Sequence, residues 1–321
     1  MTSAAALPAV VACSQTAPQT APQAGQKTAT APAVSSKIID AARLLEDVRE
    51  LSADAMEGRR FGTPGGAKAR AYVARRFAEA GLKPFFGASF EQPVTHKAGE
   101  QIINGANVVG VVRGKSSPER FIVVTAHYDH LGVKDGKVYN GADDNASGVA
   151  ALVQMAAYFS KQPPAHTIVF AALDGEEGSG FAGARALIRA LIDARYNVAL
   201  NVNLDMVSHS DRGELYASGV HHYPFLKPYV EQVAARAPVK LLMGHDRPEQ
   251  GTDDWTMQSD HGAFHQSKIT FLYFGVEDHK DYHQPTDDFD TITPAFFVHA
   301  AETILDTVKT LDADLAKVKK K

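Results

Sequence analysis

Beyond residue 36, the hydrophobic positions of the chain follow two patterns that predict helices and buried strands. In the stretch 38–56, apolar residues recur at helical spacing, which predicts an amphipathic helix. After the loop "EGRRFGTPGG", a second amphipathic helix is predicted to begin at Pro64 and to end near Leu82, because proline favours the first turn of a helix.

The rest of the chain alternates between strands and helices. Strands are predicted at 106–112, 120–127, 166–174, 197–206 and 268–274, and helices at 147–160, 181–192, 223–237 and 294–315. Such alternation favours an open, mostly parallel sheet with helices on both faces. The strand cores "VVTAH", "VFAAL" and "FLYF" are almost continuously apolar, as in the central strands of a parallel sheet. Residues 37–321 are therefore predicted to form one domain.

The first 36 residues have a different composition. Residues 1–13 form a short run of small apolar residues that ends in "VVAC" and resembles a bacterial lipoprotein signal, although no Lys or Arg precedes it. The run suits a signal peptide and is shorter than the about 20 apolar residues that span a bilayer. Residues 14–36 are rich in Ala, Pro, Gln and Thr and are predicted to be a flexible tether. We therefore expect a periplasmic or cell-envelope location with a lipidated Cys13 as membrane tether; secretion, or an Ala-rich terminus with an incidental cysteine, is the alternative.

Composition excludes two classes of protein. The net charge is −4, with 33 Lys and Arg against 37 Asp and Glu, so no nucleic-acid partner is predicted. The single cysteine rules out an internal disulfide. The 13 histidines direct attention to metal binding, since several of them stand beside carboxylates.

Each predicted central strand is followed or ended by a histidine or a carboxylate. The residues are His127 and Asp129, Asp174, Glu176 and Glu177, Asp205, and the acidic run that begins at Glu277, with Asp143 and Asp144 before a helix. One acidic loop alone is typical of a solvated turn. Together they favour a shared site, because ligands bind outside the carboxyl ends of such strands. Imidazole and carboxylate without thiolate suit zinc, manganese or cobalt, and a carboxylate can bridge two metals.

Five motifs carry a family resemblance. In order and spacing, "HYDH", "NGADDNASG", "DGEEG", "NLDM" and "DYHQPTDD" resemble the co-catalytic dizinc aminopeptidases of the bacterial leucyl aminopeptidase type, in peptidase clan MH. Upstream, Gly58, Arg59, Gly62 and Thr63 resemble that family's entry segment. The resemblance covers about 40–310 and implies a three-layer α/β/α zinc exopeptidase fold with a central, mostly parallel mixed sheet.

The resemblance also implies a ligand set for two zinc ions, with manganese or cobalt as substitutes. Carried over residue by residue, it places His127 and Asp205 on one ion, Glu177 and His283 on the other, and Asp143 between both. Asp144 is then no ligand, and the peptide between the paired aspartates is expected to be cis. Two zinc ions and three carboxylates leave one positive charge, which a hydroxide between the ions balances.

The remaining roles follow from the same resemblance. Glu176 is expected to act as the general base, and Asp129 to accept a hydrogen bond from the His127 imidazole; a strand-end cap is the alternative for Asp129. Asp260 and His261 are expected to support the structure.

Other candidate positions departed from the family pattern or stayed unassigned. The other histidines (His130, His221, His222, His265 and His279) are expected in loops or at the surface. The turn "EEGSGFAGA" is one residue longer than usual in the family, which is expected to change the rim of the pocket. Trp255, Thr256 and Met257 stand where some members have a Tyr that polarises the substrate carbonyl, so Tyr282 is the candidate for that role.

The predicted function is removal of N-terminal residues from peptides with a free N-terminus. A carboxypeptidase or dipeptidase of the same fold is the first alternative. A glutaminyl cyclase acting at a single zinc, or a non-enzymatic receptor or scaffold, is a further one. Retention of all five implied ligands argues against the cyclase and against the non-enzymatic receptor or scaffold.

Overall fold

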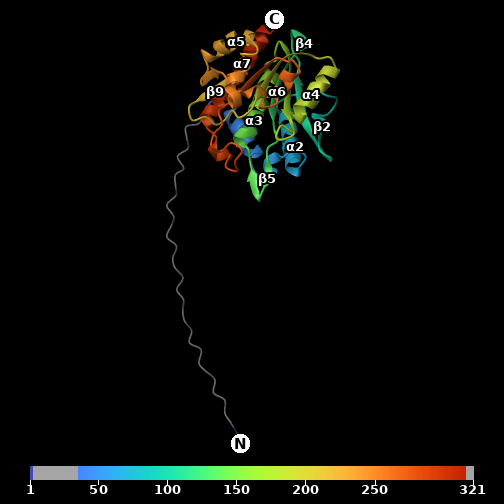
Figure 1. Ribbon diagram of the computed structural model, residues 1–321, viewed down its shortest axis with the longest axis vertical. Helices are drawn as coiled ribbons and strands as arrows, with labels where there is room; N and C mark the ends of the chain where they lie inside the picture. Colours follow the sequence, from blue (N-terminus) through green and yellow to red (C-terminus); the bar gives the residue numbers. More distant parts are fainter. Residues whose placement is uncertain (3–34, 316–321) are drawn as a thin grey trace. The chain divides into compact units, whose positions relative to one another are not determined.

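The computed structural model describes residues 1–2 and 35–315. The described residues from 35 onward form one compact unit built around a nine-stranded sheet (Figure 1). Apart from their end residues, the predicted signal segment 1–13 and tether 14–36 lie outside the described part of the chain. Among the described helices, none combines the length and the apolar character needed to cross a membrane.

Four parallel strands occupy the centre of the sheet. In spatial order they are β7 (His166–Leu173), β4 (Ser117–His127), β8 (Asn197–Leu204) and β11 (Phe271–Gly275). All four were predicted from their apolar runs, and their carboxyl ends lie at the same edge. The functional residues predicted at strand ends are therefore brought to one edge of the sheet.

Antiparallel neighbours flank the parallel centre, so the sheet is mixed. On one side lies β3 (Gln101–Val112), which carries β1 (Lys83–Pro84) and β2 (Glu91–Ala98); on the other lie β9 (Glu214–Ser218) and then β10 (Lys240–Met243). The sequence pattern predicted only part of β3 and none of the other flanking strands. Strand β2 explains why, because its sequence "EQPVTHKA" mixes charges with a proline, as edge strands do.

Helices cover both faces of the sheet. They are α1 (Ala41–Leu51), α2 (Pro64–Glu79), α3 (Gly148–Lys161), α4 (Ala182–Asp193), α5 (Lys227–Ala234), α6 (His261–Gln266) and α7 (Pro294–Asp314). Alternate residues of β4 belong to two different cores: Ile122 to the core that contains residues of α1, α2, α3, α5 and α7, and Val123 to the core that contains residues of α4 and α6. Since strand side chains alternate between faces, this confirms the predicted three-layer arrangement.

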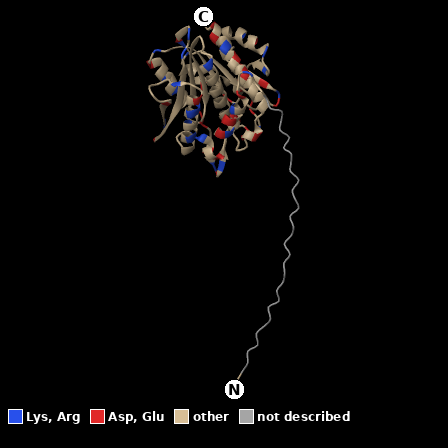
Figure 2. Ribbon diagram, turned by 180° about the vertical axis from the view of Figure 1, so that it is seen from behind, with Lys and Arg blue, Asp and Glu red and all other residues tan. Residues whose placement is uncertain are grey.

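Several elements differ from the sequence prediction in extent. The helix predicted at 223–237 is shorter, with a 3₁₀ turn at Pro224–Leu226 leading into α5. The short helix α6 and the hairpin of β5 (Gly132–Lys134) and β6 (Lys137–Tyr139) were not predicted. Seen from behind, the acidic and basic residues are interspersed over the ribbon (Figure 2), in keeping with the small net charge of −4.

Candidate metal centre

One half of the predicted site forms where β4 and β8 end side by side. His127 is the last residue of β4 and Asp205 follows the last residue of β8. The Nε2 atom of His127 lies 3.1 Å from Oδ1 of Asp205, and both side chains are buried. Asp144 completes this group, with its Oδ1 3.4 Å from the same His127 nitrogen.

The second half comes from the loops that follow β7 and β11. Glu177 follows β7, and His283 lies in the loop after β11. The Nε2 atom of His283 is 3.2 Å from Oε1 of Glu177 and 3.1 Å from Oδ2 of Asp144. The Asp144 carboxylate therefore turns one oxygen toward each half of the cluster.

The prediction that Asp143 stands between the two halves is wrong. Its Oδ1 accepts hydrogen bonds from the backbone N–H and the hydroxyl of Ser208, both at 2.7 Å, and its Oδ2 lies 3.1 Å from His279 Nε2. The cis peptide also lies one residue later than predicted, between Asp144 and Asn145. Adjacent side chains on this loop point in different directions, so Asp144 takes the central place and Asp143 anchors the loop.

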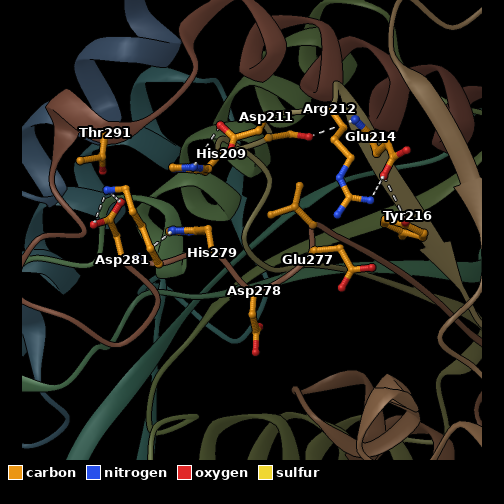
Figure 3. Close-up of a pocket in the computed structure, with 13 residues that line it drawn as sticks. His209, Asp211, Arg212, Glu214, Tyr216, Glu277, Asp278, His279, Asp281 and Thr291 are labelled. Atoms are coloured by element: carbon orange, nitrogen blue, oxygen red, sulfur yellow. Dashed lines mark hydrogen bonds and ion pairs between the residues drawn. The ribbon is translucent and has the colours of Figure 1, made fainter.

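Asp143 contacts His279, which lines a second, separate pocket of about 510 Å³ (Figure 3). Its partner His279 stacks on His209 with ring centroids 3.9 Å apart and an interplanar angle of 1°. His279 lies in the loop after β11, as expected, but its side chain is only 8% exposed. The residues that line this pocket include none of the residues around Asp144.

His130 was expected in a loop or at the surface; it lies in the loop after β4, where it is buried within the site. Its Nδ1 lies 3.2 Å from Oε1 of Glu177 and 3.6 Å from Oδ2 of Asp144, and neither ring nitrogen has a hydrogen-bond partner among the described residues. The ring packs against Gly141, where an added Cβ would stand 2.6 Å from the imidazole. Gly141 also has a φ of 57°, so glycine is required there on two counts. The sequence signal was the second histidine of "HYDH".

Asp287 fixes the loop that carries Asp144 through the backbone of that loop. Asp287, in the motif "DYHQPTDD", accepts the backbone N–H groups of Asp143 and Asp144 at 2.9 and 3.0 Å. Burial raises the pKa of Asp287 to about 7, and the charge of Asp143 acts in the same direction. Sequence reasoning assigned Asp287 no role, although it quoted the motif that contains it.

Arg59, from the predicted entry segment, is fully buried and binds only backbone carbonyls. Its guanidinium donates to the carbonyl oxygens of Leu51, Tyr128, Asn140 and Gly141, at 2.5–2.8 Å. Burial lowers its pKa to about 10, against the opposing effect of Asp144 and other nearby carboxylates. The five-donor fork of arginine can hold several acceptors at once, and here it joins the end of α1 to the loops after β4 and β6.

Asp129 was expected to orient the His127 ring, but its carboxylate mainly holds the glutamate pair. It accepts the backbone N–H groups of Glu176 and Glu177 at 3.1 and 3.2 Å. The Nδ1 atom of His127 lies 3.1 Å from the main-chain oxygen of Asp129 and 3.7 Å from its carboxylate. The ring is thus oriented by the backbone of Asp129, and the carboxylate places Glu176 and Glu177.

A pocket of about 310 Å³ opens onto the cluster. It is lined by His127, Asp144, Glu176, Glu177, Asp205 and His283 together with Gly178, Gly180, Phe181, Met206, Gln258 and Tyr282. The Tyr282 ring stacks on His283 at 4.0 Å, and burial raises the pKa of its hydroxyl. Tyr282 therefore presents a protonated hydroxyl group beside the site, consistent with its candidacy as a hydrogen-bond donor to a substrate.

Supporting residues lie behind the pocket. His261 is fully buried and its Nε2 lies 2.8 Å from the Trp255 carbonyl oxygen. Asp260 is fully buried, neither of its oxygens has a hydrogen-bond partner in the described part of the chain, and burial raises its pKa to about 8. Neither residue lines the pocket.

The electrostatics of the cluster fit a bound cation. Burial raises the pKa of Asp144 to about 6, and the charge of Glu177 adds to this. Burial opposes ionisation of Glu177 too, but contacts from His130 and His283 lower its pKa below the usual range. Burial also raises the pKa of Glu176 well above its ordinary value. Several carboxylates are therefore held together with imidazole nitrogens at 3.1–3.6 Å, a nitrogen and oxygen donor set without thiolate that suits a catalytic zinc site.

The family is decided by the sequence between 107 and 308, which matches the model of peptidase family M28. The chain belongs to peptidase family M28. This confirms the resemblance to dizinc aminopeptidases of clan MH that the motifs indicated.

Individual relatives and solved structures are also similar to this chain. A probable zinc metalloprotease of Leptosphaeria maculans is 39% identical over 132 residues, which are 39% of this chain and 30% of that protein. An aminopeptidase from Aneurinibacillus sp. strain AM-1 is 16% identical with a TM-score of 0.65, over 85% of this chain and 94% of that one. A glutaminyl cyclase from Fimbriiglobus ruber is 19% identical with a TM-score of 0.66, over 85% and 95%. These two structures confirm the fold, and the chain spans about a third of the length of the curated relatives that it matches.

Proposed function

We propose that the protein is a zinc-dependent aminopeptidase that hydrolyses the first peptide bond of substrates with a free N-terminus. One observation carries the proposal: the two oxygens of Asp144 face two separate groups of nitrogen and oxygen donors on the wall of one pocket. Such a carboxylate is placed to bridge two metal ions, as in dinuclear aminopeptidase sites.

The residues divide into two ligand groups. His127 and Asp205 would hold one ion, and Glu177 and His283 the other, with Asp144 shared between them. When bound, zinc supplies Lewis acidity, which polarises the substrate carbonyl and lowers the pKa of a water molecule. His130 is a further imidazole in the second group, with its Nδ1 3.2 Å from Glu177 and 3.6 Å from Asp144.

Glu176 is the residue suited to move the proton. It lines the pocket beside the ligand Glu177, and its backbone is fixed by Asp129. Burial raises the pKa of Glu176, so this carboxylate is basic enough to take a proton from the attacking water near neutral pH. The same group then delivers that proton to the amine that leaves.

Elemental analysis combined with an aminoacyl-anilide panel tests the proposal. We expect about two zinc ions per chain and hydrolysis of anilides with a free amine, with N-acetylated versions of the same anilides resistant. Hydrolysis of the N-acetylated substrates alone would replace the aminopeptidase with a carboxypeptidase or an endopeptidase of the same fold.

A glutaminyl cyclase is the second candidate, since two of the similar solved structures are glutaminyl cyclases. The presence of both ligand groups around Asp144 favours the peptidase. Formation of pyroglutamate from peptides with N-terminal Gln, with about one metal per chain, would favour the cyclase instead.

We also propose that the protein resides in the cell envelope, on the basis of the "VVAC" segment. Expression of the full chain and of Cys13→Ala, followed by fractionation, tests this. Equal release of both proteins into the soluble fraction would contradict a lipid tether at Cys13.

A further inference from the structure

A groove of about 670 Å³ lies beside the catalytic pocket, between strand β2 and helix α4. These two elements stand next to each other at one side of the molecule (Figure 1). Gly180 lines both the groove and the catalytic pocket. Because Gly180 is three residues after Glu177, the groove begins at most about 11 Å from the Cα atom of that residue.

The groove displays positive charges that have no partner among the described residues. Lys97 on β2 and Arg189 on α4 line it, and both are exposed without an ion pair or hydrogen bond to the described part of the chain. Asp193, on the last turn of α4, is the acidic residue in its lining. A solvent-exposed groove with free cations on both walls is suited to carboxylates.

A third cation fixes the junction between the two cavities. Arg185, also on α4, donates from Nε to the carbonyl oxygen of Gly180 at 2.8 Å. This bond holds the turn 178–180 against the start of the helix. The turn therefore lies at the boundary between the pocket and the groove.

The spacing of the cations fits an extended peptide. Arg185 and Arg189 are four residues apart on α4, which places them about 6 Å apart along the helix axis. An extended chain advances about 3.3 Å per residue, with alternate side chains on one side. Two acidic side chains two residues apart on an extended peptide would thus lie opposite Arg185 and Arg189.

We propose that the groove binds the part of the peptide substrate beyond the scissile bond, and that it selects peptides with carboxylates there. The inference rests on the proposed aminopeptidase activity, because the occupant is the portion of the substrate that leaves the catalytic pocket over Gly180. The predicted substrate class is therefore acidic peptides, whatever residue occupies the N-terminus.

The test compares amidated pentapeptides that begin with the same leucine and carry acidic, neutral or basic residues at positions three to five. For two exposed ion pairs, we expect kcat/KM to favour the acidic over the neutral peptide by about 2- to 30-fold. The double variant Lys97→Gln/Arg189→Gln should lose most of this preference, since Arg185 alone of the three cations remains, and should hydrolyse leucine anilide, which does not reach the groove, at the wild-type rate. At 1 M NaCl the preference should also shrink, since the screening length falls to about 3 Å.

A matched control keeps the net-charge change the same. Arg113 and Lys115 are exposed on the loop before β4, at the opposite end of that strand from His127. The variant Arg113→Gln/Lys115→Gln should keep the acidic preference. Equal loss in both double variants, or no acidic preference in the wild type, would overturn the groove as the binding site.

Failure of the aminopeptidase assignment can be told apart from failure of the groove proposal. If the zinc-loaded wild type leaves all free-amine anilides intact, the aminopeptidase assignment falls. Fluorescence anisotropy with labelled acidic and neutral pentapeptides then reports on the groove directly. Tighter binding of the acidic peptide by wild type than by Lys97→Gln/Arg189→Gln supports it, and equal binding overturns it.

Discussion

Substitution of the two adjacent aspartates should produce opposite effects, and their comparison is the sharpest test of the site. In Asp143→Ala, the backbone N–H and hydroxyl of Ser208 lose an acceptor inside a fully buried region. Removing one partner of a buried charged network costs about 3–5 kcal/mol. At about 2–4 °C per kcal/mol for a domain near this size, Tm should fall by roughly 6–20 °C. Asp143→Asn keeps an oxygen for Ser208, so its loss should be nearer 1 kcal/mol.

Asp144→Asn should bind less metal, but the metal-free protein should not lose stability. Burial and the charge of Glu177 raise the pKa of Asp144 to about 6 in the metal-free protein, so this carboxylate is ionised at pH 8 but its charge destabilises the folded state relative to the unfolded chain. Removal of this charge should leave the metal-free protein equally stable or more stable, by about 1–3 kcal/mol. In the presence of zinc, the same variant should bind less than one ion per chain and lose its activity.

Urea unfolding in EDTA, together with elemental analysis after zinc loading, separates the two residues. Asp143→Ala should unfold at lower urea, while Asp143→Asn keeps both metals and Asp144→Asn shows reduced metal with unchanged or increased stability. Loss of zinc from Asp143→Asn with full zinc in Asp144→Asn would show that Asp143 is the bridging residue after all.

Three further outcomes follow from the geometry. Glu176→Gln should keep both metals and lower kcat by about 10²–10⁴, the range for a lost general base; near-normal turnover in stopped assays would remove Glu176 from the mechanism. His127→Ala should lose metal, because its Nε2 faces both Asp205 and Asp144; unchanged zinc content would refute its role as a ligand. Chelation should lower Tm in scanning fluorimetry, and zinc should restore it. The stability lost on chelation should reach about 4 kcal/mol if free metal stood at 1,000 times Kd before. An unchanged Tm would count against a metal centre.

The central sheet and the edge that carries the site were predictable from the sequence. Continuous apolar runs mark buried parallel strands, and His127, Asp205 and Glu177 end or follow such strands, so topology alone brings them together. The edge strand β2 was not predictable, because its charged sequence has no apolar run. Flanking strands of this kind depend on contacts with the sheet that the local pattern does not show.

The order of residues in the sequence did not show which carboxylate, that of Asp143 or that of Asp144, turns toward the site. Spacing along the chain places both carboxylates within reach of the strand ends. Which one turns inward is decided by Asp287, which binds both backbone N–H groups, and by Ser208, which captures the Asp143 side chain. His130 was missed for a related reason, because the glycine that lets its ring pack inward is distant in sequence.

The buried guanidinium of Arg59 has a consequence for any attempt to shorten this protein. The family match begins at residue 107, yet the carbonyls that Arg59 satisfies belong partly to the loops at the catalytic edge. A fragment trimmed to the matched region would leave those oxygens without a donor, at about 1–3 kcal/mol each. The smallest fragment that keeps these carbonyls satisfied is therefore set by one cation near the amino end of the fold, ahead of the matched region.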